Sequence, residues 1–125
     1  MSRLAKPLLF MTLLALAAGQ ARAAGDPVRG GDVFDAECGD CHSLKPGKVR
    51  KGPSLFGVVG RAMATQPGYN YSDALRRLRG VWTPGQLDAY LHAPKAVVPG
   101  GRMKYDGLGY PAARADVIAF LSTIK

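Results

Sequence analysis

The sequence predicts an all-α domain of about four short helices joined by irregular loops. The clearest helical pattern closes the chain, where apolar residues at positions 117, 120, 121 and 124 follow the i, i+3, i+4, i+7 spacing of one helix face. Three earlier segments begin with helix N-terminal signals, whereas no alternating pattern typical of a strand and no internal repeat is visible. Stretches rich in Gly and Pro separate these segments and limit the length of each helix.

The first predicted helix runs from about Pro27 to Cys38. Asp26 can accept hydrogen bonds from the free amides at the helix start, where a proline loses no donor that the helix needs. Gly30 and Gly31 each cost about 1 kcal/mol relative to alanine inside a helix, so we expect them to allow close approach of another backbone. Phe34 follows Gly30 by one turn, and this face is predicted to cross another helix.

The other helices are predicted from caps and helix-breaking residues. A short helix is capped by Ser72-Asp73 and reaches about Leu78. A third helix opens with the capping box Thr83-Pro84-Gly85-Gln86 and stops before Pro94. The amphipathic pattern predicts the last helix over residues 111–125.

The only two cysteines of the sequence lie in the run Cys38-Gly39-Asp40-Cys41-His42, which also holds one of its two histidines. In a C-x-x-C-H run both thiols can add across the vinyl groups of a haem, and the adjacent histidine can ligate the iron. The run therefore predicts one haem c attached through Cys38 and Cys41, with His42 as an axial ligand. Such a cofactor would form much of the core of a domain this small.

Three other interpretations of the cysteines stay open at this point. A thioredoxin-like redox pair would lie near a strand–helix–strand pattern, which the surrounding sequence lacks. A zinc site needs about four ligands, and outside the run only His92 remains as a conventional nitrogen or sulfur donor. A disulfide between Cys38 and Cys41 would leave His42 without a role.

Residues 1–23 are predicted to be a cleaved secretory signal peptide. Arg3 and Lys6 form a basic start, an apolar run follows, and Ala21-Arg22-Ala23 fits the small-x-small cleavage pattern. The apolar run is too short to favour a membrane span, so we expect no stable membrane insertion after cleavage, with an uncleaved anchor as the alternative. Residues 24–125 then form one domain, and secretion together with haem attachment predicts the periplasm.

The charge of the whole sequence is +8, but 14 basic and 9 acidic residues remain beyond the signal segment, which leaves +5. A moderately basic protein can be steered towards acidic partners. Nucleic acid is not an expected partner, because the basic residues are spread along the chain without a recognition motif. Gly and Pro recur over residues 43–60, which are predicted to form a loop whose basic side chains are interpreted as solvated surface.

The ligand at the second axial position of a histidine-ligated haem iron decides what the haem protein can do. Methionine there gives an electron carrier of raised potential, whereas an open position gives a binding or catalytic site. Met103 lies among charged neighbours in a Gly-rich loop, where the backbone can approach a flat cofactor. Met63 is interpreted as a gap-filling core residue and His92 as an exposed side chain, so Met103 is the predicted second ligand.

Over essentially all of residues 24–125 the chain resembles the class I, mitochondrial-like cytochromes c, as a bacterial periplasmic member. Besides the attachment run, the shared blocks are Gly52-Pro53-x-Leu55-x-Gly57-x-x-Gly60-Arg61, Tyr71-x-Asp73-Ala74, Trp82, Leu87-x-x-Tyr90-Leu91-x-x-Pro94-Lys95 and Pro99-Gly100-x-x-Met103. One block alone would be weak, but all of them in order are specific. The resemblance implies the small class I cytochrome c fold, with helices and loops wrapped around one covalent haem.

The resemblance also implies roles for single residues. The first and last helices would cross, and Pro53 would accept a hydrogen bond from His42, fixing the orientation of that ring. Donors would bind a buried haem propionate, and an aromatic residue would lie close to the Met103 sulfur. The residues implied for these contacts are Tyr71 and Trp82 at the propionate, with Arg61 nearby, and Tyr90 at the sulfur.

The chain departs from that family around the haem. Leu75 and Gly101 stand where the family often has asparagine and threonine, so a thinner polar network is expected. At the exposed haem edge, lysines usual in mitochondrial members are replaced by Glu37, Gly109 and Tyr110, which leaves as local positive charges Lys95, Arg102 and Lys104. The positive charge that steers a partner towards this surface is therefore expected to be weaker.

These features predict a monomeric periplasmic electron carrier, not an enzyme. It would pass one electron between redox protein partners while His42 and Met103 stay bound to the iron. One alternative is a peroxidase-like or gas-binding haem protein with an exchangeable sixth ligand, although no distal acid–base pair is evident. Another is a dissociable cytochrome subunit of a dehydrogenase or oxidase complex.

Overall fold

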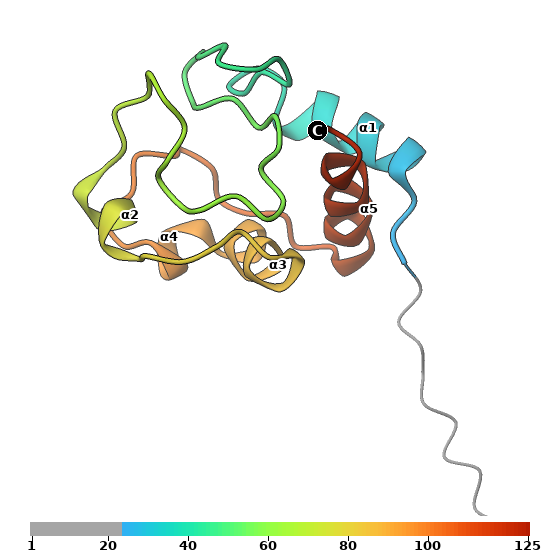
Figure 1. The fold of residues 1–125 in the computed structure, drawn as a ribbon. Coiled ribbons are helices and arrows are strands. Elements are labelled where there is room, and N and C mark those ends of the chain that lie inside the picture. The colour runs from blue at the N-terminus through green and yellow to red at the C-terminus, as the bar shows by residue number, and fades with distance from the viewer. Residues whose placement is uncertain (1–23) are drawn as a thin grey trace, which may run out of the picture.

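Five helices and the loops between them make up the computed structural model, which describes residues 24–125 (Figure 1). The helices are α1 (Pro27–Glu37), α2 (Asp73–Arg77), α3 (Pro84–His92), α4 (Pro94–Val97) and α5 (Pro111–Ser122). Within this range no strand is present, and one isolated antiparallel bridge joins Ala62 to Val81. None of these helices is long and apolar enough to cross a membrane. The all-α prediction is confirmed, while the predicted signal peptide lies outside the described residues.

Three helices begin at the caps that the sequence indicates. The Asp26 carboxylate accepts from an amide two residues on at 2.8 Å, and the Ser72 and Thr83 hydroxyls accept from amides three residues on, both at 3.1 Å. The Thr83 amide itself donates to the Val81 carbonyl, so the predicted capping box with Gln86 is closed on one side only. Each cap satisfies an amide that has no partner inside its helix.

The helix ends differ from the prediction at three places. α1 stops at Glu37 instead of Cys38, because the amides of Cys38 and Gly39 both turn back to the same Phe34 carbonyl. α5 ends at Ser122, three residues earlier than predicted. The four-residue α4 was not predicted at all: Pro94 ends α3 as a helix breaker, yet it also suits the first position of a new helix.

The most extensive packing between helices is the crossing of α1 and α5, and Figure 1 shows the two helices side by side. At Gly30 a Cβ would lie 1.9 Å from the Asp116 carbonyl oxygen, so only glycine fits at this crossing. One turn on, the rings of Phe34 and Phe120 pack with centroids 5.7 Å apart. Val117 has no exposed surface. The face predicted to make a helix crossing therefore makes it with α5.

A charged cluster at the same crossing joins the start of α1 to α5. The buried Asp116 carboxylate accepts from the Asp26 amide at 2.7 Å and from the Arg29 guanidinium at 2.9 and 3.3 Å. Arg29 also pairs with the Asp26 carboxylate at 2.9 Å. The bonds from Arg29 and then the Asp26 amide lower the pKa of Asp116. Its charged form is therefore stabilised by folding.

We expect Asp116→Asn to destabilise the protein at pH 7 and to flatten its acid unfolding. Because folding lowers the pKa of Asp116, its contribution is present above the unfolded value of about 3.9 and is lost as the pH falls through the folded value. Urea unfolding of the haem-loaded protein at pH 7 and pH 3 measures both effects. The control is Asp32→Asn, which removes the same charge from an exposed position of α1. If both variants lose the same free energy of unfolding at both pH values, the role of Asp116 is contradicted.

Candidate haem site

The run that holds both cysteines forms a tight turn directly after α1. The amides of Cys41 and His42 donate to the Cys38 carbonyl at 3.1 and 3.0 Å. Gly39 closes the end of the helix by donating to the Phe34 carbonyl at 2.8 Å. Cys38, Cys41 and His42 all lie in this turn, and each of them is partly buried.

The His42 ring is held in one tautomer by Pro53. Its Nδ1 lies 2.8 Å from the Pro53 carbonyl oxygen, which can only accept, so Nδ1 carries the hydrogen and Nε2 keeps a free lone pair. Burial lowers the pKa of His42 and outweighs the opposite effect of the Pro53 bond. The lowered pKa keeps the ring neutral. At Gly52 a Cβ would lie 2.5 Å from the ring, so glycine leaves room for it. A neutral, oriented imidazole of this kind suits a metal ligand.

The surroundings of the cysteines disfavour the other interpretations of the run. Cys38 and Cys41 are not joined by a disulfide. Burial, followed by the charges of Glu37 and Cys41, raises the pKa of Cys38 to about 11, whereas a reactive redox thiol has a lowered pKa. Across residues 24–125, no three or more His, Cys, Asp or Glu side chains gather to hold a metal ion. These facts leave haem attachment as the best explanation.

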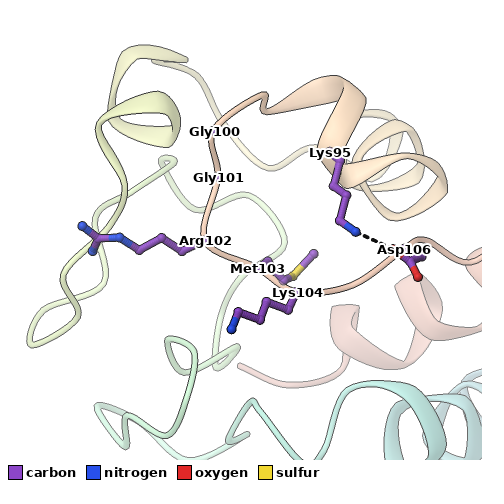
Figure 2. Close-up of a pocket in the computed structure, with 7 residues that line it drawn as sticks. All are labelled: Lys95, Gly100, Gly101, Arg102, Met103, Lys104 and Asp106. Carbon is purple, nitrogen blue, oxygen red and sulfur yellow. Dashed lines mark hydrogen bonds and ion pairs between the residues drawn. The ribbon is translucent and has the colours of Figure 1, made fainter.

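The loop after α4 presents Met103, and Figure 2 shows its side chain with the neighbours along this loop. The Tyr90 hydroxyl of α3 donates to the Met103 sulfur at 3.9 Å, and the Tyr90 ring packs on Trp82 with centroids 5.0 Å apart. This segment borders an open cavity of about 960 Å³, lined by Lys95, Gly100, Gly101, Arg102, Met103, Lys104 and Asp106. The predicted pairing of Tyr90 with Met103 is thus a contact in the structure.

The two competing candidates for the second ligand lie elsewhere. His92 is exposed at the end of α3. Met63 packs against the apolar core and lines a separate cavity of about 190 Å³ beside Trp82. Neither side chain shares the cavity bordered by Met103.

A third group of predicted residues surrounds the partly buried guanidinium of Arg61. This group donates to the carbonyls of Phe56 and Ser54 at 2.9 and 3.1 Å and to the Gln66 side chain at 2.8 Å. The Tyr71 hydroxyl accepts from the Gln66 amide at 3.2 Å and keeps its own hydrogen to donate. Tyr71 and Trp82 are both buried.

One donor of this group has no partner. Among the described residues, Arg61 Nε is the single buried side-chain nitrogen or oxygen without a hydrogen bond. Leaving such a group unpaired costs about 1–3 kcal/mol, more for a charged one. A haem propionate, as a buried carboxylate, would supply the missing acceptor. The residues present therefore fit a haem at the thiols, at the histidine and at this polar end.

The contacts of two residues near the Met103 loop, Arg114 and Tyr105, were not foreseen from the sequence. The buried Arg114 of α5 donates to Asp88 of α3 at 2.8 Å and to the Leu108 carbonyl at 2.8 Å, which ties down the end of the loop. An arginine within the helix of the clearest apolar pattern was the available signal. Tyr105 donates to the Glu37 carboxylate at 2.8 Å and so joins the loop to the end of α1.

The expected departures of the chain have structural consequences. Leu75 packs against the apolar core, which is consistent with a thinner polar network at its position. At Gly101 a Cβ would lie 3.1 Å from the Val98 carbonyl oxygen, so a side chain there would need the backbone to shift slightly.

Comparison with known proteins agrees with this geometry. The family described as Cytochrome c matches residues 27–125. Cytochrome c2 of Rhodopila globiformis is 48% identical over 101 residues, which cover 81% of this chain and 95% of that protein. Cytochrome c2 of Rhodomicrobium vannielii is 50% identical over 104 residues, with 82% of each chain covered. The cytochrome c-type cyt cy of Rhodobacter capsulatus is 48% identical over 100 residues, which cover 80% of this chain and 50% of that protein.

The family match extends over the attachment turn, the Arg61 cluster and the Met103 loop together. The chain belongs to the cytochrome c family, as a single-haem electron-transfer cytochrome that binds haem c covalently through Cys38 and Cys41.

Proposed function

We propose that His42 and Met103 are the axial ligands of the haem iron, and that the protein is a periplasmic one-electron carrier between redox proteins. One observation carries the proposal: both candidate ligand side chains have a protein partner that orients them. Pro53 orients His42 so that Nε2 is free, and Tyr90 holds the Met103 sulfur. Ligands fixed in this way need little rearrangement when the charge of the iron changes.

The bound haem supplies a one-electron iron couple. The chain's own residues then set the conditions for it. His42 donates the Nδ1 hydrogen to Pro53, so the ring cannot rotate without losing that bond. Arg61, Tyr71 and Trp82 form the binding site for a propionate, in which the unpaired Arg61 Nε and the Tyr71 hydroxyl hydrogen are the free donors. Tyr71 and Trp82 are buried and would exclude water from a propionate held there.

Contacts on both sides of Met103 keep the ligand loop in place. Before Met103, Arg102 donates to the Asn70 carbonyl. After it, Tyr105 donates to Glu37, and burial and the Glu37 carboxylate raise the pKa of Tyr105, which keeps its hydroxyl protonated. A loop tied at both flanks favours a bound methionine over an exchangeable sixth position, and the comparisons give no support for a peroxidase-like or gas-binding role. No catalytic turnover is needed.

We expect Met103→Leu to lower the reduction potential and to open the iron to added CO. Removing the sulfur removes the ligand that favours the reduced iron. Redox titration and the near-infrared methionine-to-iron absorption of the oxidised protein measure both changes. Met63→Leu is the matched control and should keep the band and the potential; an unchanged potential in Met103→Leu would refute the ligand assignment.

We expect Tyr105→Phe to loosen the Met103 loop without breaking the fold. One hydrogen bond between partly exposed groups contributes about 0.5–1.5 kcal/mol, and its loss should speed displacement of Met103 by added imidazole. Stopped-flow absorption follows this exchange. Tyr110→Phe removes an exposed hydroxyl without a role in the loop, and a rate for Tyr105→Phe no higher than this control would contradict the role of the bond.

The proposed location depends on cleavage after Ala23, which leaves residues 24–125 as one domain and a monomer in the periplasm. Expression of the full chain in a bacterium that attaches haem c tests it. The intact mass of the haem-containing protein released with the periplasmic fraction should correspond to residues 24–125 plus one haem. A mass that includes residues 1–23, recovered with membranes, would show a retained anchor instead.

A further inference from the structure

Arg114 is a buried cation on α5, with 6% of its surface exposed. Its guanidinium donates to the Asp88 carboxylate of α3 at 2.8 Å and to the carbonyls of Leu108 and Gly109 at 2.8 and 3.2 Å. Within residues 24–125, Asp88 is the one carboxylate that pairs with it. A buried charge is stable only with such partners, so the loss of any one of them weakens the whole arrangement.

The two carbonyls bound by Arg114 belong to the end of the loop that carries Met103. This end also packs on the last turn of α3, where a carbonyl accepts from the Leu108 amide at 2.8 Å. At Gly107, which has a φ of 115°, a Cβ would lie 2.3 Å from the His92 carbonyl oxygen, so only glycine fits there. The end of the loop is therefore held both by α3 and by Arg114.

Helix α3 also contacts Met103 itself, because the Tyr90 hydroxyl donates to its sulfur at 3.9 Å. Asp88 lies two residues before Tyr90 on the same helix. One helix thus carries the contact to the sulfur, the carboxylate that holds Arg114, and the carbonyl that accepts from the end of the loop. Because Arg114 joins Asp88 to the end of the loop, it fixes the Met103 loop to the helix that contacts the sulfur.

We propose that Arg114, held by Asp88, is a positioning residue that keeps Met103 on the haem iron. The inference rests on the proposed ligation by Met103 and extends it to a buried ion pair between α3 and α5. For Met103 to leave the iron, its loop must move away from α3. That movement would separate the Leu108 and Gly109 carbonyls from the guanidinium and leave buried, charged donors without acceptors. The free-energy cost of those unpaired donors opposes release of the ligand.

A second ion pair of α5 separates this role from a general contribution to stability. Asp116 pairs with Arg29 of α1 at 2.9 Å, and none of its hydrogen bonds in the described part of the chain reaches α3 or the Met103 loop. The Asp116 side chain is 9% exposed, against 36% for Asp88. Breaking the Asp116 pair should therefore cost the fold at least as much as breaking the Asp88 pair, without loosening the loop.

Imidazole exchange in the oxidised, haem-loaded protein tests the proposal. With imidazole in excess, the rate of the absorption change in stopped flow saturates at the rate at which Met103 leaves the iron. We expect this saturating rate to rise about 10-fold in Arg114→Gln and about 3- to 10-fold in Asp88→Asn, but less than about 2-fold in Asp116→Asn. Urea unfolding should show the opposite order, with Asp116→Asn losing at least as much free energy of unfolding as Asp88→Asn.

A double variant tests whether Asp88 acts through Arg114. If the two residues form one unit, Arg114→Gln combined with Asp88→Asn should release Met103 no faster than Arg114→Gln alone. Amide hydrogen exchange adds a readout that does not depend on the iron. The Gly101 and Leu108 amides are both hydrogen-bonded to backbone carbonyls, and they should exchange faster in Asp88→Asn than in Asp116→Asn.

Equal saturating rates in Asp88→Asn and Asp116→Asn would reduce the Asp88 pair to general stability and overturn the proposal. An unchanged rate in Asp88→Asn, or additive effects in the double variant, would overturn it as well. If Arg114→Gln fails to load haem, the comparison of Asp88→Asn with Asp116→Asn decides the question by both readouts.

The near-infrared methionine-to-iron band of the unmodified protein separates this inference from the function on which it rests. With the band present, any of the contradicting results removes the positioning role of Arg114 and leaves ligation by Met103 standing. Absence of the band in the unmodified protein would instead contradict ligation by Met103, and with it the proposed electron carrier.

Discussion

The hydrogen bond from His42 to the Pro53 carbonyl is the constraint on which the proposed site depends. The bond decides which ring nitrogen is free, and it can form only because several local features agree. The turn after α1 places His42, and Gly52 leaves space for the ring that any larger residue would occupy. The crossing at Gly30 in turn fixes α1 against α5 and so sets the position of the whole turn. A larger residue at Gly52 would meet the His42 ring directly, whereas one at Gly30 would displace α1 and with it the turn that carries His42.

Local sequence signals made the helix starts and the attachment run predictable. The caps at Asp26, Ser72 and Thr83 mark helix starts because each satisfies amides within three residues along the chain. The attachment run likewise carries its chemistry within five consecutive residues. α4 escaped prediction because Pro94 is both a helix breaker and a good first residue, and the choice between the two depends on tertiary packing.

Contacts between distant charged residues could not be predicted in this way. Asp116 and Arg114 lie on the helix with the clearest apolar pattern, yet both are buried, one against Arg29 and the other against Asp88. Periodicity describes which face is apolar and does not reveal a buried ion pair with a partner 26 or 87 residues away. The same limit applies to the surface charge: Glu37 and Lys95 could be counted from the sequence, but their engagement with Tyr105 and Asp106 follows from the fold.

The central claim is that the two protein ligands, a nitrogen of His42 and the sulfur of Met103, remain on the iron in both oxidation states. X-ray absorption at the iron edge of the haem-loaded protein, recorded after full oxidation and after full reduction, tests this most directly. We predict one sulfur neighbour and an unchanged number of nitrogen neighbours in both states. Loss of the sulfur neighbour in either state, or its replacement by an oxygen or nitrogen neighbour, would contradict ligation by Met103.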